Sequence, residues 1–559
     1  MTTQDTLVLD ESLVVQDHIL QHKDVVWVGW DGPDDPANPR NWTNRRKWLL
    51  SSSGIMFCAI VSLSVSGQFR VVGEATYSIS IGSVEDQMGV SKEMALLGVT
   101  LFTLTFGAAP LIIAPFSEVY GRSWIYFGSA FIFTLFFLPK ALAQNIETIL
   151  VARFISGCAG STAVSLVGGT LADVWSDEER GLPMAIFAWS AFSSSGGLIP
   201  ASITSQTGLG PIMFGYVEEN YDFRLIQWIT MGASGLFTLA LGCIVLPRET
   251  RASVLLSRKA ARLRKETGDS KYQCKFDLEQ GSFTHMMTTA LSRPVKMLAT
   301  EPILISFSAY IAFCWAILYI QLVSLPLVFG ELYDFSIGEA GMTYAAQFIG
   351  ASVGLVVDHF CNKKYIKEVG RRGPEARLYS AMAGGIFVPV GCFSFAFTSF
   401  ASIPWIVPCI CVSILYVGIL LIYLAVFSYL ADSYTLYASS ALSAMSFARN
   451  LVGAVFPLFT DSLYDRLGIQ GAGGLTSGLA TLLSVTPFVL FIYGARLRAR
   501  SPFAQELERM KRAAQALAEL KEEEVVVEPK GCDAPTIQGD VGRAVVRRLP
   551  SGEGRKEKA

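Results

Sequence analysis

The residues best able to do chemistry lie in a short charged stretch, APFSEVYGRS, which interrupts an otherwise apolar part of the chain at 114–123. Glu118 and Arg122 carry opposite charges, and Gly121 precedes the arginine. Each charge can pair with an opposite charge or a helix end, and glycine permits a tight reversal of the backbone. The stretch therefore predicts a charged turn, which is either an ordinary interfacial turn or part of the working machinery.

A second stretch, GLVVDHFCNK at 354–363, repeats this pattern later in the chain. Asp358 follows Glu118 by 240 residues, and Lys363 comes after it as Arg122 comes after Glu118. Each half of the chain thus has an acid at the end of an apolar run, followed by a cation. This repetition predicts two related halves and favours a functional turn over an incidental one.

Two arginines lie inside apolar runs. Arg153 is a few residues into its run, whereas Arg449 is about halfway along another and has Asn450 beside it. An arginine in the middle of a membrane helix costs at least ~2.5 kcal/mol, so it must face a cavity or a partner unless it lies near an end. For Arg153 a structural role at the membrane surface is the alternative. Arg449 is either a substrate or gating contact or a structural tie between helices.

Several aromatic and amide side chains stand within the apolar runs and are candidates for the wall of a central cavity. Aromatic walls with a few polar groups suit a planar or amphiphilic organic molecule. The alternative is that each ring packs between helices or lies in the interfacial belt. The candidates are Trp189, Trp315, Tyr319, Gln321, Tyr344, Gln347, Tyr416 and Tyr423.

The elements that must position these residues are predicted to be membrane helices. Of 559 residues, 51% are hydrophobic and 16% charged, and the mean hydropathy is +0.42, as in polytopic membrane proteins. A span needs about 20 apolar residues. Twelve such runs occur in two groups of six, and they begin near 48, 93, 124, 148, 183, 225, 302, 338, 378, 404, 438 and 475.

These runs predict an all-α membrane protein of twelve transmembrane helices in two pseudo-symmetric six-helix bundles. The predicted segments are an N-terminal segment at 1–47, a first bundle at 48–246, a central loop at 247–301, a second bundle at 302–497 and a partly disordered tail at 498–559. The central loop holds a basic amphipathic helix, expected to lie on the membrane or against the bundle. With a cytoplasmic N-terminus, the inside segments carry about 24 Lys and Arg and the outside loops about 5. This bias predicts that both termini are cytoplasmic.

Three motifs give the chain a resemblance to a known family. APFSEVYGRS resembles the loop motif Gly-x-x-x-Asp-x-x-Gly-Arg-Lys/Arg, and ILVARFISGCAGST at 149–162 resembles the motif of the fourth span. TGLGPIMFG at 207–215 resembles the glycine–proline motif of the fifth span, through Gly208, Gly210, Pro211 and Gly215. Over roughly 25–515 the chain resembles the major facilitator superfamily, in the fungal part of its twelve-span drug:proton antiporter branch.

The resemblance implies a transporter whose two halves rock around a central site. It implies that Glu118 and Arg122, with Asp358 and Lys363 in the second copy, gate the cytoplasmic side, and that Arg153 lies at the cavity and takes part in proton coupling. The implied partners are a small organic substrate, protons and the lipid bilayer. We expect no cofactor, no metal and no nucleic acid, a monomer, and a multi-pass location in the cell membrane, with the vacuolar membrane as alternative.

The leading hypothesis is a proton-coupled exporter of a secondary metabolite, toxin or drug. A second is a transporter of polyamines or organic acids, and a third is a non-transporting receptor on the same scaffold. An enzyme is not expected, because the sequence has no phosphate-binding loop and no nucleophile elbow.

The fifth span departs from the expected pattern. Residues 183–217 form 35 uncharged residues, about 52 Å as a helix, which exceeds one crossing. Residues 196–206 are either a broken helix that serves the substrate cavity or an insertion from an error in the gene model.

Overall fold

The computed structural model describes residues 26–66 except 33, 88–176, 223–245, 248–274 except 270, and 283–506. It also describes residues 179, 183, 186, 216, 217, 220, 221 and 509. The chain divides into two units, Met1–Gln505 and Glu506–Ala559, and everything below concerns the first. Trp189, Gly208, Gly210, Pro211, Gly215 and the stretch 196–206 lie outside the described residues.

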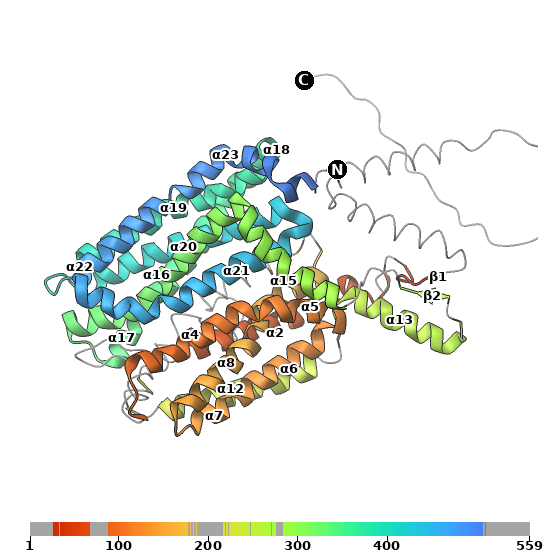
Figure 1. The fold of residues 1–559 in the computed structure, drawn as a ribbon, viewed down its shortest axis with the longest axis horizontal. Coiled ribbons are helices and arrows are strands. Elements are labelled where there is room, and N and C mark those ends of the chain that lie inside the picture. The colour runs from red at the N-terminus through yellow and green to blue at the C-terminus, as the bar shows by residue number, and fades with distance from the viewer. Residues whose placement is uncertain are drawn as a thin grey trace, which may run out of the picture. The chain divides into compact units, whose positions relative to one another are not determined.

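The described part of the chain is almost entirely helical (Figure 1). In the first half the elements are β1 (Val26–Trp27), η1 (Pro39–Asn41), α2 (Asn44–Ser66), α4 (Lys92–Ala108), α5 (Pro110–Tyr120), α6 (Arg122–Leu135), α7 (Phe137–Ala141), α8 (Ile146–Gly160), α9 (Thr162–Val174) and α12 (Phe223–Val245). The central loop contains α13 (Ala252–Thr267), β2 (Tyr272–Gln273) and α15 (Phe283–Thr300). In the second half the elements are α16 (Pro302–Tyr333), α17 (Ile337–Thr343), α18 (Ala345–Arg372), η2 (Gly373–Arg377), α19 (Leu378–Thr398), α20 (Ile406–Tyr434), η3 (Thr435–Tyr437), α21 (Ala438–Val455), α22 (Pro457–Leu483) and α23 (Thr486–Arg500).

Several of the apolar runs are bent. Pro110 follows Ala109 at the junction of α4 and α5, where the axis turns by 43°. Proline has no N–H to donate and its ring crowds the preceding turn, which explains the break. In α22 the backbone leaves the helical region at Gly468, which divides Pro457–Leu483 into two helical parts.

Among the described residues, seven helical runs are long and apolar enough to cross a membrane, and eight if the bent pair of α4 and α5 is one span. Two of these runs, Gly338–Thr398 and Pro457–Arg500, contain 61 and 44 residues. At about 1.5 Å per residue both are long enough for more than one crossing. The number of twelve spans therefore stays a prediction. The runs counted here are fewer, but they do not exclude it.

The buried apolar side chains form two large clusters. One is built mainly by α16, α18, α19, α20 and α21, and the other by α2, α6, α9 and the end of α12. The helix α4 contributes to both, through Leu96 and Val99 in the first cluster and Phe102 in the second. The first cluster also includes Ile149 of α8 and Phe223 at the start of α12, so it extends from the second half into the first, and α4 lies where the two clusters meet.

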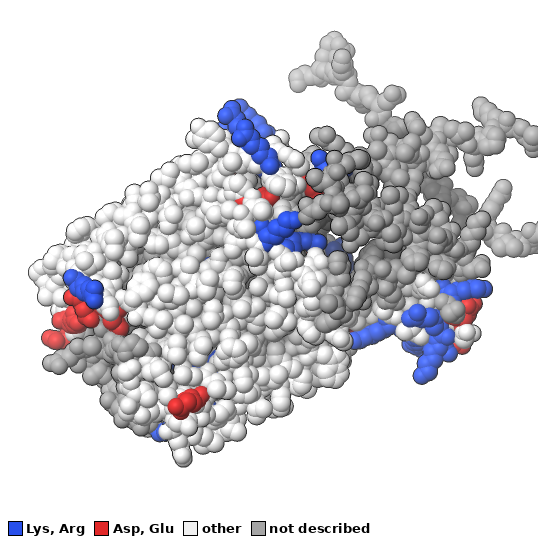
Figure 2. Space-filling view, in the orientation of Figure 1, with Lys and Arg blue, Asp and Glu red and all other residues white. Residues whose placement is uncertain are grey.

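The outer surface matches a membrane solvent. Figure 2 shows a face on which charged side chains gather at the two ends, with a broad uncharged band between them. Large apolar side chains are exposed on several helices, including Leu236 and Leu239 of α12, Leu482 of α22 and Ile492 of α23. In water such a surface would associate with other apolar surfaces, whereas lipid tails solvate it.

The N-terminal segment is fastened to the central loop. β1 pairs in parallel with β2, and Lys259 of α13 donates to Asp31 at 2.6 Å and to the carbonyl of Gly29 at 3.1 Å. Val28 and Trp30 pack on Leu256, Ala260 and Cys274. We call residues 26–31 and the surface of α13 and β2 that they cover the N-terminal clasp. The apolar side of α13 is thus covered partly by the chain's own N-terminal segment, which the sequence did not suggest.

The clasp predicts how the central loop resists proteolysis. Trp30→Ala removes an apolar contact and Asp31→Ala a surface ion pair worth ~0–1 kcal/mol, so both variants should be cleaved faster by trypsin between Arg258 and Lys271, the tryptophan variant most. The control is Asp34→Ala, at an exposed acid nearby. Equal cleavage of all three variants, measured by mass spectrometry of timed digests, would contradict the clasp.

Candidate functional site

The charged turn at 114–123 is built around a buried arginine. Gly121 has φ +97°, a conformation that side chains with a Cβ rarely adopt, and this residue ends α5 and precedes α6. The Arg122 side chain then enters the first half, where its Nε lies 3.0 Å from Oδ2 of Asp173 on α9. Its Nη1 donates to the carbonyl of Leu166 at 3.2 Å. Only 7% of Arg122 is exposed.

A second carboxylate, that of Glu249, caps the N-terminus of α6. Its Oε1 accepts hydrogen bonds from the backbone N–H groups of Arg122 at 3.0 Å and Thr250 at 2.9 Å, and its Oε2 accepts from Ser123 at 3.3 Å. The first N–H groups of a helix have no partner within it, and the helix dipole favours an anion at this end. Glu249 lies after α12, so this contact joins the sixth predicted span to the third. A Cβ on Gly121 would collide with the same carboxylate.

Arg251 links the remaining charges. Its guanidinium lies 3.7 Å from Glu118 on α5 and 3.5 Å from Asp173. We call Glu118, Arg122, Asp173, Glu249 and Arg251 the turn network. Burial raises the pKa of the Asp173 carboxyl, whereas Arg122 and Arg251 lower it, so the carboxylate depends on both guanidinium groups for its charge.

All five members of the turn network belong to the first half and the start of the central loop. Glu118 pairs with Arg251, and among the described residues neither Glu118 nor Arg122 makes an ion pair with the second half. The gating role expected for them stays a prediction. The sequence analysis missed Glu249 and Arg251. The signal was present in PRETR at 247–251, a charged run directly after an apolar helix.

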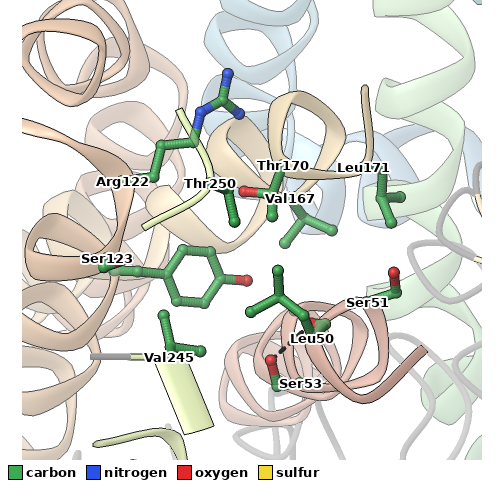
Figure 3. A pocket seen from close by; sticks show the side chains of 12 residues that line it. Leu50, Ser51, Ser53, Arg122, Ser123, Val167, Thr170, Leu171, Val245 and Thr250 are labelled. Atoms are coloured by element: carbon green, nitrogen blue, oxygen red, sulfur yellow. Dashed lines mark hydrogen bonds between the residues drawn. The ribbon is translucent and has the colours of Figure 1, made fainter. Parts of the chain in front are cut away.

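A small crevice adjoins the turn network (Figure 3). Leu50, Ser51 and Ser53 of α2 face Val167, Thr170 and Leu171 of α9 across it. The hydroxyls of Tyr126 and Thr250 also line it, and both are buried without a hydrogen-bond partner in the described part of the chain. The crevice has room for water rather than for an organic substrate.

The second half has a comparable network beside Asp358, whose carboxylate interacts electrostatically with Arg377. Asp358 of α18 accepts a hydrogen bond from Ser380 at 2.7 Å. Lys363 is exposed, and its amine lies 5.5 Å from the ring of Phe360 on the same helix. The structure therefore does not pair these two residues with each other as a copy of the turn.

The tertiary counterpart of Arg122 and Asp173 is Arg377 and Asp432. Arg377 lies at the start of the third predicted span of its half and Asp432 near the end of the fourth, with Nε and Oδ2 3.0 Å apart. Glu375 beside Arg377 pairs with Arg498 of α23 at 2.8 Å, so the third and sixth spans are joined here as they are by Glu249 in the first half. Gly373, with φ +66°, precedes this network as Gly121 precedes the other.

One group of the predicted cavity residues comes together around Arg449. Its guanidinium lies over the rings of Trp315 at 4.3 Å and Tyr423 at 5.3 Å, and these two rings are 5.5 Å apart. Such cation–π contacts are worth ~0.5–2 kcal/mol each. Arg449 is 5% exposed, and its Nε has no hydrogen-bond partner among the described residues. Asn450 is buried as well and donates to the carbonyl of Ser446 at 2.9 Å.

This group lies where the two halves meet. The hydroxyls of Thr103 on α4 and Tyr319 on α16 are hydrogen-bonded at 3.3 Å, and Thr100 donates to the carbonyl of Ala454 on α21 at 2.9 Å. Gly107 of α4 passes so close to Asn450 that a Cβ would not fit. We call the contact of α4 with α16 and α21 the seam.

A second group of predicted residues lies inside the second half. The Tyr344 hydroxyl donates to the carbonyl of Leu322, next to Gln321, and Tyr344 interacts electrostatically with Tyr416. Gln347 lies one turn after Tyr344. Side-chain polar atoms of Gln321, Gln347 and Tyr416 are buried without partners in the described part of the chain, which calls for waters or a ligand there.

Arg153 lies apart from both groups. It stands on α8, and its side chain packs against Gly98 of α4. α4 thus lies between Arg153 on one side and Asn450 on the other. No group of three His, Cys, Asp or Glu side chains that could hold a metal occurs among the described residues.

The comparisons with known proteins agree on one family. The family model for the Major Facilitator Superfamily matches residues 63–457. The chain is 33% identical to the efflux pump radE of Floropilus chiversii over 87% of either chain. It is 34% identical to the multidrug transporter mdrA of Aspergillus fumigatus, over 90% of this chain and 80% of the other. It is 35% identical to the efflux pump MFS2 of Trichophyton rubrum, over 94% of this chain and 85% of the other.

The fold is that of a solved transporter. The crystal structure of the peptide transporter POT in complex with sulfate superimposes with a TM-score of 0.55 at 13% identity, over 81% of this chain and 95% of that one. At this identity the likeness concerns the fold alone.

The backbone at Gly121 gives a test of the turn network. Gly121→Ala should lower the free energy of unfolding by about 1–3 kcal/mol, because the residue has a positive φ and its Cβ would displace Glu249 from the start of α6. The control is Gly128→Ala on the same helix, where a Cβ meets nothing within 4 Å and alanine should be neutral or stabilising. Equal thermal stability of both variants in detergent would contradict the proposed geometry.

Proposed function

The chain belongs to the major facilitator superfamily, and from this premise we propose that it is a secondary active transporter that exports a small organic compound in exchange for protons. The observation that carries the proposal is Arg449, buried against Trp315 and Tyr423 beside the seam. A charge and two aromatic rings beside the contact between the two halves suit the binding of a small organic molecule that must be reached from either side in turn. The names of the relatives, efflux pumps and a multidrug transporter, favour export.

We propose twelve spans in two bundles at 48–246 and 302–497, in a monomer. The end of the bundles that carries α13 and α15 faces the cytoplasm, because the Lys- and Arg-rich segments of the sequence gather there. The cell membrane is the proposed location. In the vacuolar membrane, the same transporter would move the compound from the cytoplasm into the vacuole instead of out of the cell.

We propose that the turn network acts as a gate. It joins the ends of α5, α6, α9 and α12, so the first half can move as one body. Glu118 has 51% of its side chain exposed, and its ion pair within the described part of the chain is a 3.7 Å contact with Arg251, so it can exchange this partner for one on the other half when that half approaches. Asp358 and Lys363 are proposed to contribute to the surface of the second half that Glu118 would meet. An energy of ~1–3 kcal/mol in such contacts shifts a two-state equilibrium by one or two decades.

An ion gradient is the proposed energy source, since the sequence has no phosphate-binding loop for ATP. Arg153 is the proposed contributor to proton coupling, and Gly208, Gly210, Pro211 and Gly215 are the proposed antiporter motif in the fifth span. Trp189, Gln321, Tyr344, Gln347 and Tyr416 are proposed to line the path of the substrate.

A second candidate, transport of an organic acid, is favoured by one observation. None of the ion pairs in the described part of the chain includes Arg449, so an anion would meet an uncompensated positive charge there. A cationic polyamine would be repelled by the same charge.

Removal of the buried guanidinium tests the gate. Arg122→Ala should reduce transport at least about tenfold without loss of the protein from the membrane, because Asp173 loses an ion pair and α6 loses its tie to α9. The matched control is Arg258→Ala, at an exposed arginine of α13. Transport equal to that of the control variant would make the turn an ordinary interfacial turn.

The function itself is tested by untargeted mass spectrometry of cells with and without the protein, at two external pH values. We expect a compound that accumulates inside cells lacking the protein, with export that weakens as the inward proton gradient falls. A compound depleted inside these cells would instead identify an importer.

A further inference from the structure

In the proposed twelve-span arrangement, Arg449 stands near the middle of the eleventh span. It is 11 residues from the start of α21, which corresponds to about 16 Å along a helix and to about half of a 30 Å hydrocarbon core. A charge at this depth is retained only where a partner or a cavity compensates it. The identity of that partner therefore bears on what the site binds.

The groups around Arg449 compensate its charge only in part. Two of them are the faces of Trp315 and Tyr423, which attract a cation through their π electrons but carry no opposite charge. The neighbouring Asn450 amide donates to the backbone of its own helix, and the hydroxyls of Thr103 and Tyr319 are hydrogen-bonded to each other. The Nε of Arg449 is buried without a hydrogen-bond partner among the described residues. One edge of the guanidinium is thus a donor in need of an acceptor.

The site is closed by the seam. α4 of the first half packs against α21 at Gly107 and Thr100 and against α16 at Thr103. Separation of the two halves along these contacts would uncover Arg449 together with the rings that hold it. The chemistry that such a surface recognises is a planar anion, because a guanidinium binds a pair of oxygens in its plane and the rings stack on an aromatic body.

We propose that Arg449, Trp315 and Tyr423 form a recognition subsite for an aromatic organic acid, a compound whose ionised carboxylate or acidic hydroxyl is attached to a flat ring system. The guanidinium donates hydrogen bonds from its Nε edge to the acid group, and the indole of Trp315 and the phenol ring of Tyr423 hold the aromatic part. The proposal rests on the proposed transport function and narrows its substrate class. It also assigns Arg449 a role in binding rather than a purely structural tie between helices.

The test uses the purified full chain in lipid nanodiscs and two matched probes, radiolabelled 2-naphthoate, which is ionised at pH 7, and uncharged 2-naphthamide. By equilibrium dialysis, the unaltered protein should bind the naphthoate at least tenfold more tightly than the amide. Arg449→Gln should remove this preference by weakening naphthoate binding at least tenfold while amide binding is unchanged. Arg449→Lys, which keeps the charge but not the planar fork, should lose less.

The matched control is Arg293→Gln. Arg293 lies over the ring of Tyr437, 5.3 Å away, and thus makes a cation–π contact as Arg449 does. Its helix α15 precedes the second bundle, so Arg293 is not placed within a predicted span. Its substitution should leave both affinities unchanged. The proposal is overturned if the unaltered protein binds the two probes alike or binds neither, if Arg449→Gln weakens both equally, or if the control variant behaves like Arg449→Gln.

A second measurement separates this proposal from the transport function. Proteoliposomes of the unaltered protein are tested for movement of naphthoate driven by an imposed proton gradient. Selective binding without movement would support the subsite and count against proton-driven export. Proton-driven export of another compound, together with equal binding of the two probes, would support the function and overturn the subsite.

Discussion

The buried guanidinium of Arg122 is the constraint on which one end of the first half depends. A charge taken out of water must be paired and hydrogen-bonded, and Arg122 meets this requirement through Asp173 and the carbonyl of Leu166. Its path into the bundle also requires Gly169 on α9, where any Cβ would collide with the guanidinium. Arg122 therefore ties α6 to α9, as does the hydrogen bond between the hydroxyls of Ser129 and Thr162, and Glu249 ties α12 to the same place.

The second half meets a similar requirement with different residues. Arg377 and Asp432 occupy the positions of Arg122 and Asp173 in their own half. The contact between the third and sixth spans has its acid on opposite sides in the two halves. In the first half the acid, Glu249, follows the sixth span, whereas in the second half the acid, Glu375, precedes the third span and the sixth span supplies Arg498. Both halves thus connect their third and sixth spans at this end, but the acidic side chain lies beside a different span in each half.

The seam has another chemistry. Apart from the apolar side chains of α4, its contacts are one hydroxyl pair, a hydroxyl on a carbonyl and a glycine against an asparagine, each weak by itself. Weak, neutral contacts suit two bodies that must separate and rejoin, whereas the ionic joints lie within the first or the second half. The strongly charged side chain at this level, Arg449, is held by rings of the second half and makes no ion pair across the seam in the described part of the chain.

The sequence by itself determined the membrane class, the family and the places where charge interrupts the apolar runs, because these depend on local composition and on motifs of fixed spacing. It found Arg122, Arg449 and the aromatic candidates, but not their partners. The tertiary structure was needed to show that Glu118 pairs with Arg251, and that Arg377 and Asp432 are the counterpart of Arg122 and Asp173, with Asp358 beside them. It also decided that Trp315 and Tyr423 meet Arg449 while Tyr344 and Tyr416 do not. The physical reason is that these partners stand 26 to 134 residues apart in the chain. A hydrophobic period shows which face of a helix is buried but not which helix it meets, whereas an ion pair or a ring contact requires atoms within a few ångströms.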